Sequence, residues 1–244
     1  MAAPDVRGFR AALDQALSMA DSSGRITSDA KWGVYAFYDF EDEPIYVGQT
    51  NEKLRARIRR HLTNQRTDAV GMRVLDPYEV YSIEMWPLWE FSGDAAGLPI
   101  EQKKKHLDRL ERTVYDRAVK ASRFGVILNE KIPPDVLPIP DQQLPTPVKY
   151  SVVPDSVLAE RRHPDNRIAR RAEALGRLAN VVRERGSVTT GLRRVVVVQA
   201  VRLAWLGALR LAEAEGRPAP EFRELVNLEG LVAGALGPDT DEEL

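Results

Sequence analysis

The stretch that decides the fold is residues 32–61, WGVYAFYDFEDEPIYVGQTNEKLRARIRRH. It contains two aromatic and β-branched runs, separated by acidic residues and a proline, which is typical of two strands joined by a turn. We therefore expect a β-hairpin with strands at 32–40 and 44–49. In such a hairpin Tyr35 and Tyr46 can project from the same face of the sheet.

The residues after the hairpin predict a basic helix at 53–65. Arg57 and His61 are four residues apart and so share one helix face. Arginine supplies a permanently charged, forked phosphate ligand, and histidine can exchange a proton near neutral pH. The other basic residues predict contacts to a nucleic-acid backbone, which fix position without reading sequence. They are Lys53, Arg55, Arg59, Arg60 and Arg66. The alternative interpretation is a solvated basic face.

A second long helix is expected at 101–122, after a third strand near 78–86. Leu107, Leu110, Val114 and Ala118 form its apolar stripe, and Glu111 falls within that stripe. A carboxylate in this position is costly unless it is paired or binds a metal ion. Glu111 is therefore a candidate metal ligand, or alternatively an acid paired with an arginine.

Composition and charge place the chain among soluble globular proteins, with 43% hydrophobic and 29% charged residues. The chain has no cysteine, which excludes disulfides, thiolate zinc sites and cysteine nucleophiles, and is compatible with a cytoplasmic location. The apolar stretch 195–211 is interrupted by two arginines, which favours a buried helix over a membrane span. Residues 155–217 hold 13 basic and 7 acidic side chains, a surplus of six positive charges.

The chain divides into three parts by its sequence pattern. Residues 1–131 predict an α+β domain, a small antiparallel three-stranded sheet flanked by helices, with a helix at the N-terminus. Residues 132–154 contain seven prolines and predict an extended linker, or a strap across the first domain. Residues 155–244 predict a mostly helical region, with helices at 167–185, 192–215 and 221–235.

The ordered motifs together resemble those of the GIY-YIG nuclease superfamily. Gly33-Val34-Tyr35 is followed by Tyr46-Val47-Gly48, then by Arg57 and His61, with Glu111 and Asn129 further on. Each tripeptide alone is weak evidence, whereas the ordered set is specific. The resemblance covers residues 31–131. Two departures are Gln49, where many members have lysine, and the long interval between Glu111 and Asn129.

The resemblance implies a catalytic role for six residues and a divalent metal ion, Mg²⁺ or Mn²⁺, at Glu111. Tyr35 would accept the proton of the attacking water and pass it to His61, and Tyr46 would orient the water or phosphate. Arg57 would stabilise the transition state. Asn129 is placed in the site only by its position after a short strand. The branch that resembles restriction enzymes is the nearest match, because His61 can replace the missing lysine.

The function expected from this resemblance is a metal-dependent DNA endonuclease, acting on double-stranded DNA in restriction or anti-phage defence. Cutting both strands with one site per chain suggests a homo-oligomer. The competing hypothesis is a binding module that has lost catalysis and grips nucleic acid or a partner through its basic helical region. The arginines that favour it are Arg161, Arg162, Arg167, Arg170 and Arg171.

Overall fold

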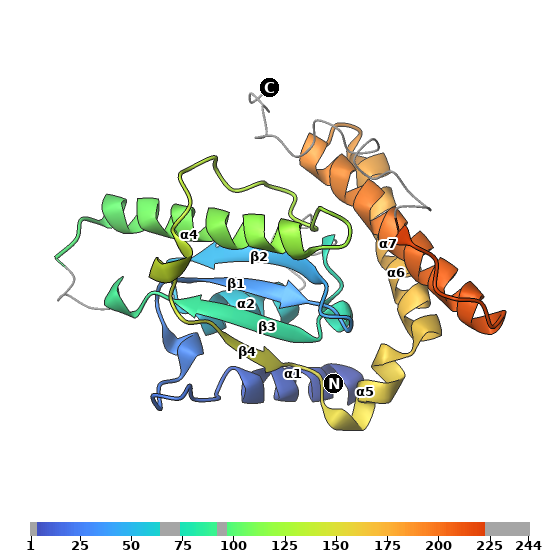
Figure 1. The fold of residues 1–244 in the computed structure, drawn as a ribbon, viewed down its shortest axis with the longest axis horizontal. Coiled ribbons are helices and arrows are strands. Elements are labelled where there is room, and N and C mark those ends of the chain that lie inside the picture. Colours follow the sequence, from blue (N-terminus) through green and yellow to red (C-terminus); the bar gives the residue numbers. More distant parts are fainter. Residues whose placement is uncertain (1–3, 64–73, 92–96, 223–244) are drawn as a thin grey trace.

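The computed structural model describes residues 4–63, 74–91 and 97–222. Its centre is a four-stranded antiparallel sheet with the strand order β2-β1-β3-β4 (Figure 1). The strands are β1 Gly33–Tyr38, β2 Pro44–Thr50, β3 Ser82–Pro87 and β4 Val148–Ser151. The helices are α1 Pro4–Ala16, α2 Leu54–Thr63, α4 Ile100–Ala121, α5 Asp155–Arg162, α6 Pro164–Arg185 and α7 Thr190–Ala214.

The two faces of the sheet bury two separate hydrophobic clusters, because successive side chains of a strand point to opposite faces. Val34 and Ala36 pack with α4 in one cluster. Tyr35 and Phe37 pack with residues of α1, α2, α6 and α7 in the other. The predicted hairpin, basic helix, third strand and long central helix are all confirmed, as is the α+β fold class.

The sheet has one strand more than predicted. β4 lies within the proline-rich segment 132–154 and pairs with β3, with Glu84 opposite Lys149. The prolines leave room for it because they cluster before residue 148, and a proline would interrupt strand pairing. Ile139, Val152 and Val153 from the same segment are buried. The segment therefore runs as a strap across the sheet domain (Figure 1).

The helical region shares a hydrophobic cluster with the sheet domain. Leu178 and Val181 of α6 and Val195 and Val198 of α7 are buried in the same cluster as Tyr35. α7 is long and apolar enough to cross a membrane, yet much of it is buried inside this fold. The division into 1–131, 132–154 and 155–244 stays a prediction. Two of its parts, 1–131 and 155–244, share this hydrophobic cluster. Most of the expected helix at 221–235 lies outside the described residues.

A buried ionic network joins the helical region to the turn between β1 and β2. Asp39 Oδ2 accepts hydrogen bonds from Arg171 Nη2 and Arg202 Nη2, both at 3.0 Å, and Arg167 Nη2 lies at 3.4 Å. Glu79 Oε2 accepts from Arg171 Nε at 2.9 Å and Arg167 Nε at 3.3 Å. All five side chains are buried. Burial, followed by the neighbouring Arg171, lowers the pKa of Arg202 to about 10.

Some of the basic side chains in the surplus of residues 155–217 are therefore buried inside the protein. Arg167 and Arg171, which we expected as nucleic-acid contacts in a binding module, are buried against carboxylates. Arg161 is also buried and lies over the ring of Tyr78, 4.7 Å from its centroid. That expectation is wrong for these three residues, because the acidic turn 39–43 and Glu79 supply the network's counter-charges within the chain.

Replacing Asp39 with Asn should lower the free energy of unfolding by about 3–5 kcal/mol, because buried Arg202 loses its hydrogen-bonded carboxylate and buried Arg171 keeps only Glu79. Asp42→Asn is the matched control in the same turn. Asp42 is exposed and pairs only with Lys149 at the surface, so its loss should cost less than about 1 kcal/mol. Urea denaturation of both variants measures the difference. Equal losses would contradict the role given to Asp39.

Candidate active site

The register of the hairpin brings the two predicted tyrosines together. Tyr35 pairs with Gly48 and Phe37 pairs with Tyr46, so Tyr35 and Tyr46 are diagonal neighbours on one face. Their ring centroids lie 6.3 Å apart. α2 packs over this face and adds His61, whose ring lies 5.8 Å from that of Tyr35 and 5.4 Å from that of Tyr46. The three aromatic rings therefore form one cluster.

Gly48 is required by this arrangement. A Cβ atom on residue 48 would lie 2.6 Å from the Tyr35 hydroxyl, 2.7 Å from Tyr35 Cζ and 3.0 Å from Tyr46 Cε1. Contacts this short cannot be accommodated without moving a ring, and Tyr35 is fully buried. The glycine of the second tripeptide thus allows the Tyr35 ring to lie directly over strand β2.

Burial makes both tyrosines weak acids. It raises the pKa of Tyr35 well above its usual value, assisted by Tyr46 and opposed by the Arg57 charge. Burial likewise raises the pKa of Tyr46 to about 12, again opposed by Arg57. A Tyr35 phenolate is therefore disfavoured in the free protein. The Tyr35 hydroxyl has no hydrogen-bond partner among the described residues. A neutral Tyr35 can still relay a proton, receiving one while it donates its own.

Arg57 differs from the other lysine and arginine side chains of residues 53–60. Lys53 and Arg55 pair with Asp29, at 3.3 Å and 3.2 Å. Arg59 pairs with Asp14 at 2.7 Å, and Arg60 pairs with Glu52. Within the described ranges Arg57 has no carboxylate at ion-pair distance, and its Nε is buried without an acceptor. A half-buried guanidinium without a counter-ion is suited to binding an anion from outside the protein.

Lys53 and the paired arginines of α2 remain candidates for phosphate contacts. Their ion pairs are at least partly exposed, and exposed pairs contribute little stability, so a phosphate can replace the carboxylate. The bonds of Arg55 to Ser28 Oγ and the Leu17 carbonyl oxygen show that it also holds α2 against the N-terminal part of the chain. Arg66 lies outside the described residues.

Glu111 projects from α4 on the other side of strand β2. Burial raises its pKa to about 7, and the charge of Asp108 adds to this, while Arg57 and the backbone N–H of Gln49 oppose it. Arg57 thus acts electrostatically on both tyrosines and on Glu111. The two faces of the sheet meet at the free edge of β2, where Gly48 and Gln49 separate the aromatic cluster from the glutamate.

The side chain of Asn129 is bonded to the backbone of strand β2. Its Oδ1 accepts a hydrogen bond from the Val47 backbone N–H at 3.0 Å, and its Nδ2 donates to the Val47 carbonyl oxygen at 2.8 Å. The side chain is buried and fully engaged in these two bonds. Asn129 therefore holds edge strand β2 in place between Tyr46 and Gly48, which makes it a positioning residue.

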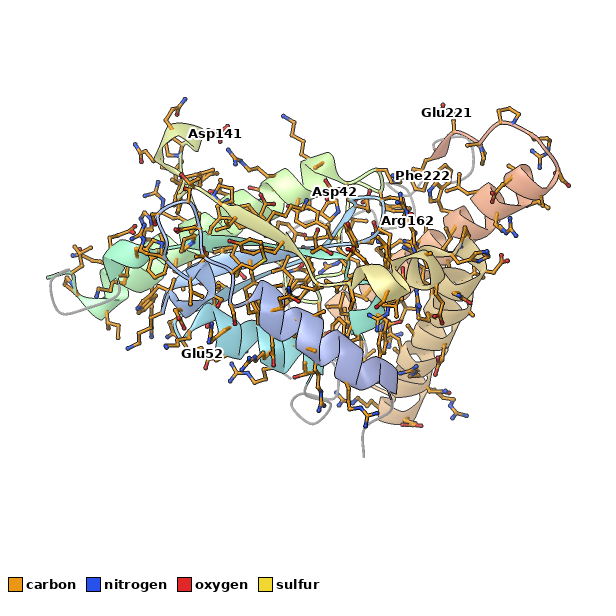
Figure 2. The ribbon with its side chains drawn as sticks, turned by 90° about the horizontal axis from the view of Figure 1, so that it is seen from below. Asp42, Glu52, Asp141, Arg162, Glu221 and Phe222 are labelled. Atoms are coloured by element: carbon orange, nitrogen blue, oxygen red, sulfur yellow. The ribbon has the colours of Figure 1, made fainter. Side chains whose placement is uncertain are left out.

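A cleft of about 350 Å³ opens beside these residues. It is lined by Gln49, Thr50, Asn51, Glu52, Arg57, Lys104, Leu107 and Asp108. Figure 2 shows Glu52, which lines the cleft, on a different side of the molecule from Arg162 and Phe222. Arg57 belongs to both the cleft and the tyrosine–histidine cluster. Arg57 is thus the one member of the predicted catalytic set that lines the cleft.

Comparison with known families decides the identity of this arrangement. Residues 31–109 match the family model of the GIY-YIG catalytic domain. This part of the chain is a GIY-YIG catalytic domain. Its members are nucleases, and the matched region contains both tripeptides, Arg57 and His61. Glu111 and Asn129 follow the matched region. No curated protein and no solved structure matches the chain.

Two further side chains of this GIY-YIG site were missed by our sequence analysis. Asp108 lies outside the apolar stripe of its helix, yet its Oδ1 accepts a hydrogen bond from Gln49 Nε2 at 2.8 Å. Gln49 was noted only as a missing cation. The available signal was the spacing of Asp108 and Glu111, three residues apart on one helix face. Gln49 therefore contacts one carboxylate through its side chain and the other through its backbone.

Gly48→Ala should reduce the cleavage rate about a hundredfold or more while the protein stays folded, because the added methyl group displaces the Tyr35 ring. Gly176→Ala is the matched control, since a Cβ atom there meets nothing within 4 Å. Cleavage rates and far-ultraviolet circular dichroism of both variants provide the measurement. A Gly48→Ala protein with normal activity would show that the position of Tyr35 does not matter.

Proposed function

We propose that this GIY-YIG protein is a divalent-metal-dependent endonuclease that hydrolyses phosphodiester bonds in DNA. The observation that carries the proposal is Arg57. It is the basic side chain of α2 left without a counter-ion among the described residues, it lines the cleft, and its charge acts on Tyr35, Tyr46 and Glu111. A phosphodiester entering the cleft supplies the missing negative charge.

The protein residues divide the chemistry between the two sides of strand β2. On the α2 side, Tyr35 orients the attacking water and relays its proton to His61, which acts as the base. Tyr46 limits the positions open to the water and the phosphate. Arg57 stabilises the charge that builds up on the phosphate oxygens as the new bond forms. These roles require Tyr35 as a neutral relay, in agreement with the direction of its pKa shift.

Glu111 fits the role of a metal ligand. Its carboxylate is partly buried and its pKa of about 7 shows that the ionised form lacks sufficient stabilisation from the protein alone. No group of three or more His, Asp or Glu side chains within the described ranges is arranged to hold a metal ion. A site with so few protein ligands suits Mg²⁺, which keeps several waters, and Mn²⁺ can replace it. When bound, the ion would neutralise the phosphate and stabilise the leaving oxygen.

The biological setting we propose is restriction or anti-phage defence, with double-stranded DNA as the substrate. The combination of Gln49 after the second tripeptide with His61 on α2 supports this branch. A double-strand break needs two sites, which supports action as a homo-oligomer, and the absence of cysteine supports a cytoplasmic location. The alternative of an inactive binding module loses its main argument, since Arg167 and Arg171 are buried in the ionic network.

Glu111→Gln should abolish plasmid cleavage in the presence of Mg²⁺ and leave DNA binding in its absence nearly unchanged. Glu101→Gln is the matched control on the same helix, because Glu101 is exposed and pairs only with Lys105. Arg57→Ala should lower the cleavage rate by about 10²–10³. Gel assays with Mg²⁺, Mn²⁺ and a chelator measure these effects. Cleavage by the folded Glu111→Gln variant at the wild-type rate would place the metal ion elsewhere.

A further inference from the structure

The cleft contains a second cation that has no counter-ion. Lys104 is exposed on α4 and lines the cleft together with Arg57. Within the part of the chain that the structure describes, Lys104 forms no ion pair, whereas the next residue, Lys105, pairs with Glu101 at 3.0 Å. Glu52 is also part of the cleft wall, but it is engaged by Arg60. The cleft thus presents two unpaired positive charges on opposite walls.

The same cleft presents a fixed hydrogen-bond acceptor. Gln49 Nε2 donates to Asp108 Oδ1 at 2.8 Å, which holds the carboxylate in one orientation. The other oxygen, Oδ2, has no donor among the described residues. Leu107, which is buried, adds an apolar surface next to it, and the side chain of Asn51 is exposed at the rim. The cations can bind phosphates, the oriented acceptor can bind a base amino group, and the apolar wall can contact the base. Together these features match the parts of a nucleotide.

Resting on the proposed nuclease function, we infer that this cleft is a subsite for one unpaired nucleotide next to the cleaved phosphodiester. Lys104 contacts the phosphate beyond the one held by Arg57, and Asp108 Oδ2 accepts a hydrogen bond from the amino group of the base. Its volume of about 350 Å³ is within the range of small-molecule sites. A base enters such a cleft only when it is out of its stack, so the preferred substrate contains a single-stranded or extrahelical nucleotide.

The amino-group contact gives the subsite a preference among bases. Adenine, cytosine and guanine carry an exocyclic amino group, and thymine does not. An acceptor placed to meet an exocyclic amino group therefore favours the first three over thymine, whose ring N3–H is the only donor of its base. Asp108→Asn replaces one carboxylate oxygen with an amide that can donate, so the preference should be lost.

The test measures binding of single-stranded oligonucleotides to the full chain carrying Glu111→Gln, without metal, so that it does not depend on cleavage. In this background Lys104→Ala should weaken binding and reduce the salt slope by about 0.7, the effect of one phosphate contact on a single strand. Lys105→Ala is the matched control and should change neither. With Asp108 present, we expect oligonucleotides of the other three bases to bind about tenfold more tightly than those of thymine, and Asp108→Asn should remove this difference. Asp116→Asn, whose carboxylate pairs with Arg112, is its control.

Three results would overturn the subsite. The first is an equal effect of Lys104→Ala and Lys105→Ala on affinity and salt slope. The second is tighter binding of a fully paired duplex than of the same duplex carrying one unpaired nucleotide. The third is a preference among bases that Asp108→Asn leaves unchanged. The nuclease proposal is tested separately by cleavage with wild-type protein. A protein that cleaves DNA but fails these binding tests would contradict only the subsite proposal.

Discussion

The structure depends on the burial of Asp39 among three arginines. Asp39 lies at the end of β1, and its carboxylate is bonded to Arg171 and Arg202 with Arg167 nearby. Breaking a buried ion pair costs several kcal/mol because one charge is left uncompensated. The turn that joins the two catalytic strands is therefore fixed by the helical region. Arg194 of α7 makes a second connection to strand β2. It donates to the carbonyl oxygens of Asn129 and Glu130, and the side chain of Asn129 is bonded to Val47 of β2.

Basic residues in this protein fall into two groups that composition does not distinguish. The buried arginines of α6 and α7 balance acids of the sheet domain, and most cations of α2 balance surface acids. Arg57 and Lys104 have no carboxylate partner in the described ranges, and both line the same cleft. The cleft thus presents two positive charges that the described part of the protein leaves without a carboxylate. This distribution separates the substrate site from the much larger set of structural arginines.

Much of the fold could be predicted from the sequence, because its signals are local. The alternation of 32–49 fixed the hairpin and the shared face of Tyr35 and Tyr46, and the helical stripe placed Glu111 on the inner side of α4. Contacts between distant segments left no such signal. The partners of Asp39 lie more than 120 residues away, and Asn129 reaches Val47 across 82 residues. β4 was missed because four residues in a proline-rich segment carry too short a pattern to identify.

We propose that the helical region holds the β1–β2 hairpin in place instead of acting as a separable DNA-binding domain. The most direct test removes residues 155–244 and follows urea unfolding of the remaining fragment. We expect no cooperative transition, since Asp39 and Glu79 lose their arginines and the shared core is opened. Neutralising both acids in the fragment, Asp39→Asn with Glu79→Gln, should recover part of the structure. A soluble fragment 1–154 that unfolds cooperatively and cleaves DNA would contradict the account.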